Sequence, residues 1–256
     1  MTLVVGILCS DGVVMAADGA ATYAVMSQQT IRQPMKKLYI LPKDIIAGVS
    51  GPIGTAQRYC AEIPRMQIKG NDQPDQVMQK IRAAILPIVK DELTMAQVAA
   101  PVVGNANASL TALASAMVAI TVQGEPCLFQ FNWQGSPEAA SKDLPFIAIG
   151  SAQATADPFL AFIRRLFWPD KLPTAPEGVF AAVWTVRHAI QTSPGGVAEP
   201  IQVAVLKGGK ARELEQAELE ECERAIDAAE KRCTNAVPSA AADAPAPDVA
   251  PPPQAP

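Results

Sequence analysis

Two pairs of short apolar runs open the chain and predict strands. Residues 3–8 and 13–17 flank Asp11-Gly12, and Asp-Gly between apolar runs is a strong hairpin signal. Residues 37–41 and 45–50 predict a second hairpin. Neither pair alternates cleanly between apolar and polar residues, so we expect strands covered on both faces, as in a sheet between a second sheet and a layer of helices.

Helical spacing and further strand-like runs follow. The expected elements are, in chain order, helices at 54–66 and 74–96, strands at 114–122, 127–133 and 146–149, helices ending near 168 and covering 176–191, and a strand at 201–206. This order predicts an α+β body over residues 2–207, with two stacked sheets between helical layers.

The end of the chain changes composition twice. Residues 208–234 predict an acidic amphipathic helical extension, with apolar side chains spaced by three or four at Leu219, Cys222, Ile226, Ala229 and Cys233. This stripe fits packing on its own domain, a contact in an oligomer or the lining of an internal cavity. Residues 235–256 contain seven prolines among mainly Ala, Asp, Val and Ser, and predict a disordered tail.

Charge and hydropathy exclude several classes of protein. The 256-residue chain has a formal net charge of −4 and offers no basic surface for nucleic acid. Its longest apolar or weakly polar run, residues 111–122, is too short for a membrane span of about 20 residues. Five cysteines without a C-x-x-C pair argue against a disulfide framework or thiolate zinc site and favour the cytoplasm. With a single histidine, His188, no metal or cofactor is expected.

Thr2 is the first candidate for chemistry. Initiator methionine is normally removed before a residue as small as threonine, which would make Thr2 the first residue of the mature chain. An N-terminal threonine combines a hydroxyl nucleophile with an amine of pKa about 7.7–8.0, so it can carry its own general base. Many ordinary proteins also begin with Met-Thr, so this signal needs support from other residues.

Ordered sequence blocks supply that support. The blocks are Thr2-Leu3-Val4-Val5-Gly6, residues 11–22 with Asp18-Gly19-Ala20-Ala21-Thr22, Lys36-Lys37-Leu38, residues 46–51 and residues 143–151. Together they resemble proteasome β subunits and their bacterial relative HslV, and indicate a divergent bacterial proteasome homologue. The resemblance implies a four-layer αββα sandwich of the N-terminal-nucleophile hydrolase type.

The same resemblance assigns catalytic roles to five residues. Thr2 would be the nucleophile, with its amine as the base. Lys37 would lie near the Thr2 hydroxyl, and Asp18 would pair with Lys37. The backbone N–H of Gly51 would face the oxyanion, and Ser151 would hydrogen-bond the Thr2 amine.

Plainer interpretations exist for the same residues. Lys36 is an alternative catalytic lysine, although Lys37 directly precedes the apolar residue Leu38 and has the family's spacing to Gly51. Asp18 also suits a strand-end cap, Gly51 a turn, and Ser151 a helix N-cap.

Substrate contacts are implied in the same way. The backbones of Thr22 and Gly51 would bind an extended peptide as an added strand. Ala20, Val49 and Ile53 would line the pocket for the side chain before the cleaved bond. Since none of these side chains is charged, we expect a preference for neutral, apolar substrates.

Several positions depart from the family pattern. Leu3 follows the nucleophile where threonine is usual, and Pro52, which has no N–H, follows Gly51. Near residue 191, proteasome subunits carry an aspartate followed three residues later by Ser-Gly-Gly, whereas this chain has Gln191 and Pro194. Thr192 or Ser193 could substitute.

The leading hypothesis is therefore a cytoplasmic, self-compartmentalising threonine peptidase. Homo-oligomeric double rings would enclose its sites, and peptides or unfolded proteins would be its substrates. The chain has no G-x-x-x-x-G-K-[ST] loop, so an ATP-dependent unfoldase would be a separate protein. The alternatives are an inactive or weakly active ring scaffold of the same fold, and an N-terminal-nucleophile amidase acting on small molecules.

Overall fold

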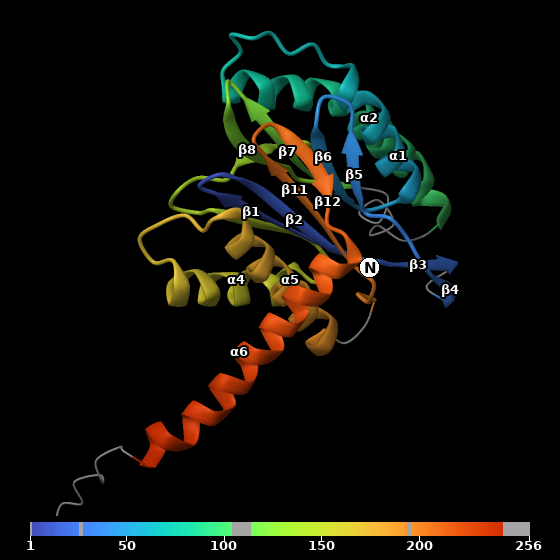
Figure 1. The fold of residues 1–256 in the computed structure, drawn as a ribbon. Coiled ribbons are helices and arrows are strands. Elements are labelled where there is room, and N and C mark those ends of the chain that lie inside the picture. Colours follow the sequence, from blue (N-terminus) through green and yellow to red (C-terminus); the bar gives the residue numbers. More distant parts are fainter. Residues whose placement is uncertain (1, 26–27, 104–113, 194–195, 243–256) are drawn as a thin grey trace, which may run out of the picture.

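Two five-stranded antiparallel sheets lie face to face between two layers of helices (Figure 1). The computed structural model describes residues 2–25, 28–103, 114–193 and 196–242. The first sheet has the order β10-β1-β2-β11-β12, and the second has the order β5-β6-β7-β8-β9. This arrangement confirms the predicted α+β sandwich of two sheets between helices.

The strands of the first sheet are β1 (Leu3–Cys9), β2 (Gly12–Asp18), β10 (Phe146–Gly150), β11 (Ile201–Lys207) and β12 (Lys210–Glu213). Those of the second are β5 (Leu38–Leu41), β6 (Ile45–Ser50), β7 (Ser115–Val122), β8 (Glu125–Phe131) and β9 (Pro137–Ala139). A separate hairpin consists of β3 (Ala20–Val25) and β4 (Gln28–Pro34). The helices are α1 (Ile53–Glu62), a 3₁₀ turn (Ile63–Arg65), α2 (Pro74–Val103), α4 (Gln153–Phe167), α5 (Ala175–Thr192) and α6 (Gln216–Ala242).

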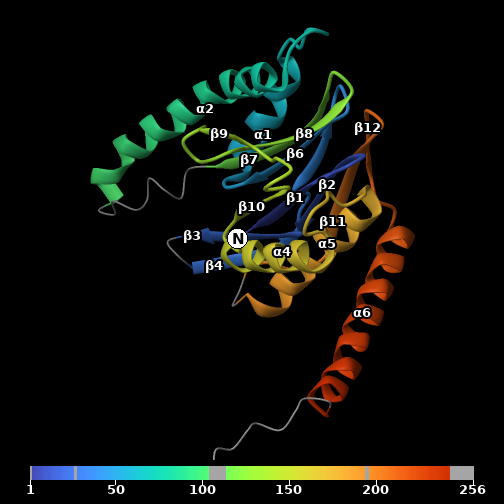
Figure 2. The same ribbon diagram turned by 90° about the vertical axis from the view of Figure 1, so that its left-hand side faces the viewer.

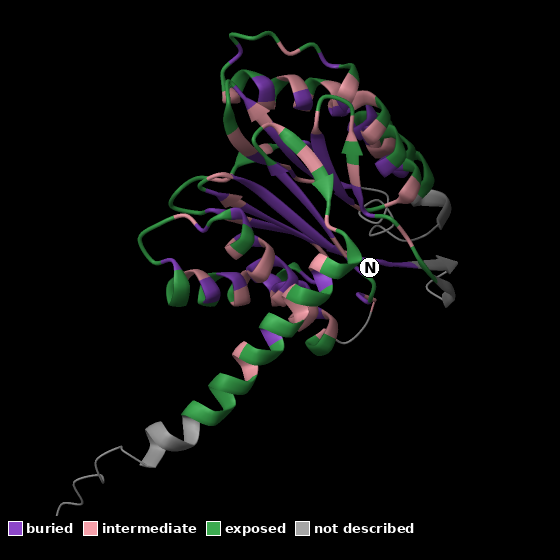
Figure 3. Ribbon diagram, in the orientation of Figure 1, coloured by how far each residue is buried: buried purple, intermediate pink, exposed green. Residues whose placement is uncertain are grey.

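Three apolar layers hold the sandwich together. Helices α4 and α5 pack on the first sheet around residues such as Val5 and Val186. Helices α1 and α2 cover the second sheet around Ile81 and Phe131. Met15 is among the residues buried between the sheets. Every residue of β2 is buried, which explains why the first apolar runs do not alternate (Figure 3).

The hairpin β3–β4 and the strands β9 and β12 are absent from the elements predicted from the sequence. The hairpin β3–β4 is not predicted, because residues 28–33 are largely polar and form no apolar run. Residues 210–213, expected in the helical extension, instead form strand β12 beside β11. Gly208 and Gly209 connect the two strands with φ angles of 57° and 74°. Such a two-glycine connection is a hairpin signal, since both positions of a type I′ turn need positive φ.

Helix α6 begins on the body of the protein and then leads away from it (Figures 1 and 2). Leu219 and Ile226 are buried in the layer formed with α5. The Arg187 guanidinium of α5 pairs with Asp227 and Glu230 at 2.6 and 3.3 Å. The first part of the helix therefore packs on its own domain, one of the three uses that its apolar stripe allows.

The outer part of α6 extends past the predicted end of the helical extension. Residues 231–236 are exposed, and the helix continues through Ala242, eight residues into the segment predicted as a tail. This stretch is rich in alanine, which has the highest helix propensity. The rest of the predicted tail, residues 243–256, lies outside the described residues. Within the described part of the chain, no helix is long and apolar enough to cross a membrane.

Candidate active site

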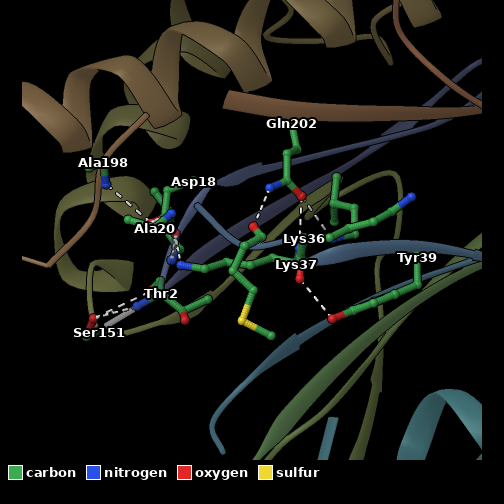
Figure 4. A network of polar contacts seen from close by, with 12 residues as sticks. Thr2, Asp18, Ala20, Lys36, Lys37, Tyr39, Ser151, Ala198 and Gln202 are labelled. Carbon is green, nitrogen blue, oxygen red and sulfur yellow. Dashed lines mark hydrogen bonds and ion pairs between the residues drawn. The ribbon is translucent and has the colours of Figure 1, made fainter. Parts of the chain in front are cut away.

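Thr2 lies at the start of β1, where the neighbouring strand β10 turns toward α4. Leu3 pairs with Gly150 across the sheet, which places Ser151 beside Thr2. The Thr2 nitrogen donates a hydrogen bond to Ser151 Oγ at 3.2 Å, and Ser151 Oγ donates to the Thr2 carbonyl at 3.4 Å (Figure 4). The structure thus brings together the predicted nucleophile and the predicted partner of its nitrogen.

Asp18 ends β2 as a fully buried carboxylate. Its Oδ1 accepts from the Leu3 N–H at 2.8 Å and from Lys37 Nζ at 2.7 Å. Its Oδ2 accepts from the N–H groups of Ala20 and Ala198, each at 3.3 Å. Three backbone donors and one ammonium group therefore hold this carboxylate, which is much more than a strand-end cap requires.

Lys37 is the lysine that reaches this carboxylate. Its side chain is 6% exposed, whereas the Lys36 ammonium pairs with Glu213 at the surface. Burial lowers the pKa of Lys37 below its ordinary value, while the charge of Asp18 and its hydrogen bond act in the opposite direction. The geometry thus favours Lys37 over Lys36 as the lysine of the site.

A small pocket of about 80 Å³ opens beside Thr2, Lys37 and Gly51. Gly51 follows β6 with φ = 141°, a conformation that favours glycine. Val49 and Ile53, two of the residues predicted to contact substrate, line this pocket. Its other apolar and aromatic lining residues include Ala21, Met35, Tyr39 and Ala56.

For one predicted pocket residue, the structure places its neighbour in the sequence on the pocket instead. Ala20 is buried and does not line the pocket, whereas Ala21 does. Successive strand residues point to opposite faces, so an error of one residue reverses the side chain. Tyr39 of β5 also lines the pocket and is not among the residues predicted from the sequence. Thr22 belongs to β3 by its backbone, and its side chain lies outside the described residues.

Gly150 holds Thr2 close to the end of β10, and its replacement tests this contact. Gly150 has φ = 113°, and an added Cβ would lie 2.1 Å from the Thr2 carbonyl oxygen. We expect Gly150→Ala to lower the free energy of unfolding by more than about 3 kcal/mol, because strain and overlap add. Gly124→Ala is the matched control, since φ there is 84° and its Cβ meets no atom within 4 Å. If Gly150→Ala and Gly124→Ala lower the free energy of unfolding in urea by the same amount, the close approach of Gly150 to Thr2 is not important for stability.

The hydroxyls near Gln191 are engaged elsewhere. Thr192 Oγ1 donates to the His188 carbonyl at 2.7 Å, and Ser193 Oγ lies 3.3 Å from Thr155 Oγ1. Gln191 is exposed at the end of α5, and Pro194 lies outside the described residues. The structure therefore does not bring Thr192 or Ser193 to the Thr2 nitrogen as substitutes.

The other side chains that could be reactive are His188 and the five cysteines. The His188 ring stacks on Phe159 with 4.2 Å between centroids. The five cysteines are free thiols. Among the described residues, no group of three or more His, Cys, Asp and Glu side chains is placed to hold a metal ion.

A family model of known proteins matches the first part of the chain. Residues 2–69, which include Thr2, Asp18, Lys37 and Gly51, match the family model of proteasome subunits. Among curated proteins, none matches the chain.

Solved structures extend the likeness to the whole fold. Anbu (ancestral beta-subunit) from Yersinia bercovieri has a TM-score of 0.65 at 13% identity, covering 96% of this chain and 100% of that one. Anbu in the helical assembly of the Anbu complex from Pseudomonas aeruginosa also has a TM-score of 0.65, at 16% identity, covering 96% and 98%. Anbu from Hyphomicrobium sp. strain MC1 has a TM-score of 0.61 at 16% identity, covering 96% and 100%. These structures share the proteasome-like fold and, with the family match, support a divergent bacterial proteasome homologue.

Proposed function

We propose that this divergent bacterial proteasome homologue is a threonine peptidase whose nucleophile is the hydroxyl of Thr2. The observation that carries the proposal is the placement of Thr2 and Lys37 on one pocket, with Lys37 paired to the buried Asp18. A buried ion pair is expensive to form unless many hydrogen bonds satisfy it. Its location on the same pocket as the Thr2 hydroxyl favours a catalytic use.

The reaction follows from these positions. Once Met1 is removed, the Thr2 amine accepts the proton of its own hydroxyl while the oxygen attacks the substrate carbonyl. The Gly51 N–H would donate to the oxyanion that forms. The amine then returns the proton to the departing peptide amine, leaving an ester on Thr2. Water activated by the same amine hydrolyses this ester and restores the hydroxyl.

Two neighbours set the properties of the amine and hydroxyl. The positive charge of Lys37 favours the deprotonated amine and the developing negative charge on oxygen. Ser151 Oγ, at 3.2 Å, fixes the direction of the Thr2 nitrogen. Asp18 fixes Lys37 and leaves the proton transfers to Thr2.

We also propose a substrate preference and an assembly for this peptidase. Val49, Ile53 and Ala21 would accept a neutral, apolar side chain, with the peptide backbone between Thr22 and Gly51. Stacked homo-oligomeric rings in the cytoplasm would enclose the sites, and a separate ATP-dependent unfoldase would deliver unfolded chains. The Anbu complex from Pseudomonas aeruginosa forms a helical assembly, which supports self-association of this fold.

Intact-mass spectrometry with a peptide epoxyketone tests the proposal. This reagent requires both the hydroxyl and the free amine of an N-terminal threonine. We expect loss of Met1 and one adduct per chain, and no adduct on Thr2→Ala. Retention of Met1 would refute the peptidase function for that form of the protein, because the base would then be an amide.

A second candidate is a ring scaffold with little or no activity. It is favoured by Gln191 at the position of the family's aspartate and by the engagement of Ser193 with Thr155. Loss of Met1 without an adduct, together with a ring in mass photometry, would support this scaffold. A monomer or dimer would instead favour an amidase for small molecules.

A further inference from the structure

Lys37 is held by its backbone as well as by its ammonium group, and the backbone contact comes from Gln202. The Lys37 N–H donates to Gln202 Oε1 at 2.8 Å, and Gln202 Nε2 donates to the Met35 carbonyl at 2.6 Å (Figure 4). The Leu38 N–H also points to Oε1, at 3.4 Å. We propose that Gln202 is a positioning residue that fixes Lys37 relative to Thr2, an inference that rests on the proposed peptidase function.

The segment before β5 needs such a contact. Residues 35–37 belong to no strand, and β5 is an edge strand of the second sheet. Polar backbone groups in a half-buried segment require partners. A carboxamide offers an acceptor and a donor in one planar group, so a single glutamine can bind the carbonyl of residue 35 and the N–H of residue 37. Gln202 therefore fixes the path of the chain on both sides of Lys36.

Gln202 and Asp18 are anchored in adjacent strands of one sheet. The register pairs Ile201 with Asp18 and Gln202 with Ala17. Asp18 holds the Lys37 ammonium at 2.7 Å, and Gln202 holds its N–H at 2.8 Å. Both ends of the lysine are thus tied to the first sheet, although Leu38 begins a strand of the second. Since Thr2 precedes β1 of that first sheet, the same sheet sets the positions of nucleophile and lysine.

This arrangement makes a specific kinetic prediction. Gln202→Met keeps the length of the side chain and removes its hydrogen bonds. We expect kcat on a fluorogenic apolar peptide to fall about tenfold or more, because small displacements of a catalytic group are costly. KM should change less than kcat, since Gln202 itself does not line the pocket beside Thr2, although Met35 does. Deuterium exchange of the peptide covering residues 35–38 should become faster.

The matched control is Gln130→Met. Gln130 is a half-buried glutamine in β8, three strands away from β5 in the second sheet. It should leave kcat and the exchange of residues 35–38 at wild-type values. A Gln202→Met protein with wild-type kcat and exchange would refute the positioning role alone. An inert wild-type protein with no epoxyketone adduct would instead refute the proposed function, while the exchange data would still decide whether Gln202 holds residues 35–38.

Discussion

Asp18→Ala is expected to lower the free energy of unfolding by about 3–5 kcal/mol. The substitution removes the carboxylate that faces the buried Lys37 ammonium at 2.7 Å. Breaking a buried ion pair by removing one partner leaves an uncompensated charge, and losses of this size are typical. The N–H groups of Leu3, Ala20 and Ala198 also lose their acceptor. Urea unfolding followed by circular dichroism measures the change.

Glu213→Ala is the control for this prediction. Glu213 pairs with Lys36, and both side chains are about half exposed. Exposed pairs contribute about 0–1 kcal/mol, so we expect a loss within that range. A loss for Asp18→Ala no larger than that for Glu213→Ala would show that the buried pair is not important for the fold.

Lys37→Met is expected to reduce kcat by about 10²–10³ while costing less stability than Asp18→Ala. Methionine fills the buried volume but removes the positive charge beside the Thr2 amine and hydroxyl. Removal of one electrostatic group from an active site typically costs this factor. Asp18 keeps its three backbone donors, from Leu3, Ala20 and Ala198, so its carboxylate stays solvated by the protein.

Lys36→Met is the control that distinguishes the roles of the two lysines. The Lys36 ammonium points to Glu213 rather than to Asp18, so its loss should change kcat much less than the loss of Lys37. Steady-state hydrolysis of the same fluorogenic peptide by both variants provides the measurement. The reverse order of effects would assign the catalytic role to Lys36.

The sequence predicts those parts of the fold where apolar runs are long. β1, β2, β5 and β6 are each almost wholly apolar, so their pairing into two hairpins can be read from the chain. The hairpin β3–β4 is different because its second strand is polar. Its existence depends on tertiary position rather than on local pattern.

The candidate site, like the fold, can be predicted from the sequence only in part. Family blocks indicate Thr2, Asp18, Lys37, Gly51 and Ser151 as candidates, and the structure gathers them at one end of the sheets. Gln202 belongs to none of those blocks and lies 165 residues after Lys37. One signal for it exists, since it is the single polar residue in the run Ile201–Leu206. A polar side chain in a strand covered on both faces needs a partner, but the sequence does not identify that partner.

Helix α6 extends beyond the layer that holds its first part. Contacts with α5 hold the helix as far as Glu230, and residues 231–236 are exposed. At 1.5 Å per residue, Ala242 lies about 24 Å beyond Ile226 and Glu230 about 6 Å beyond it. The helix from residue 231 to Ala242 therefore extends about 18 Å past the ion pair of Glu230 with Arg187.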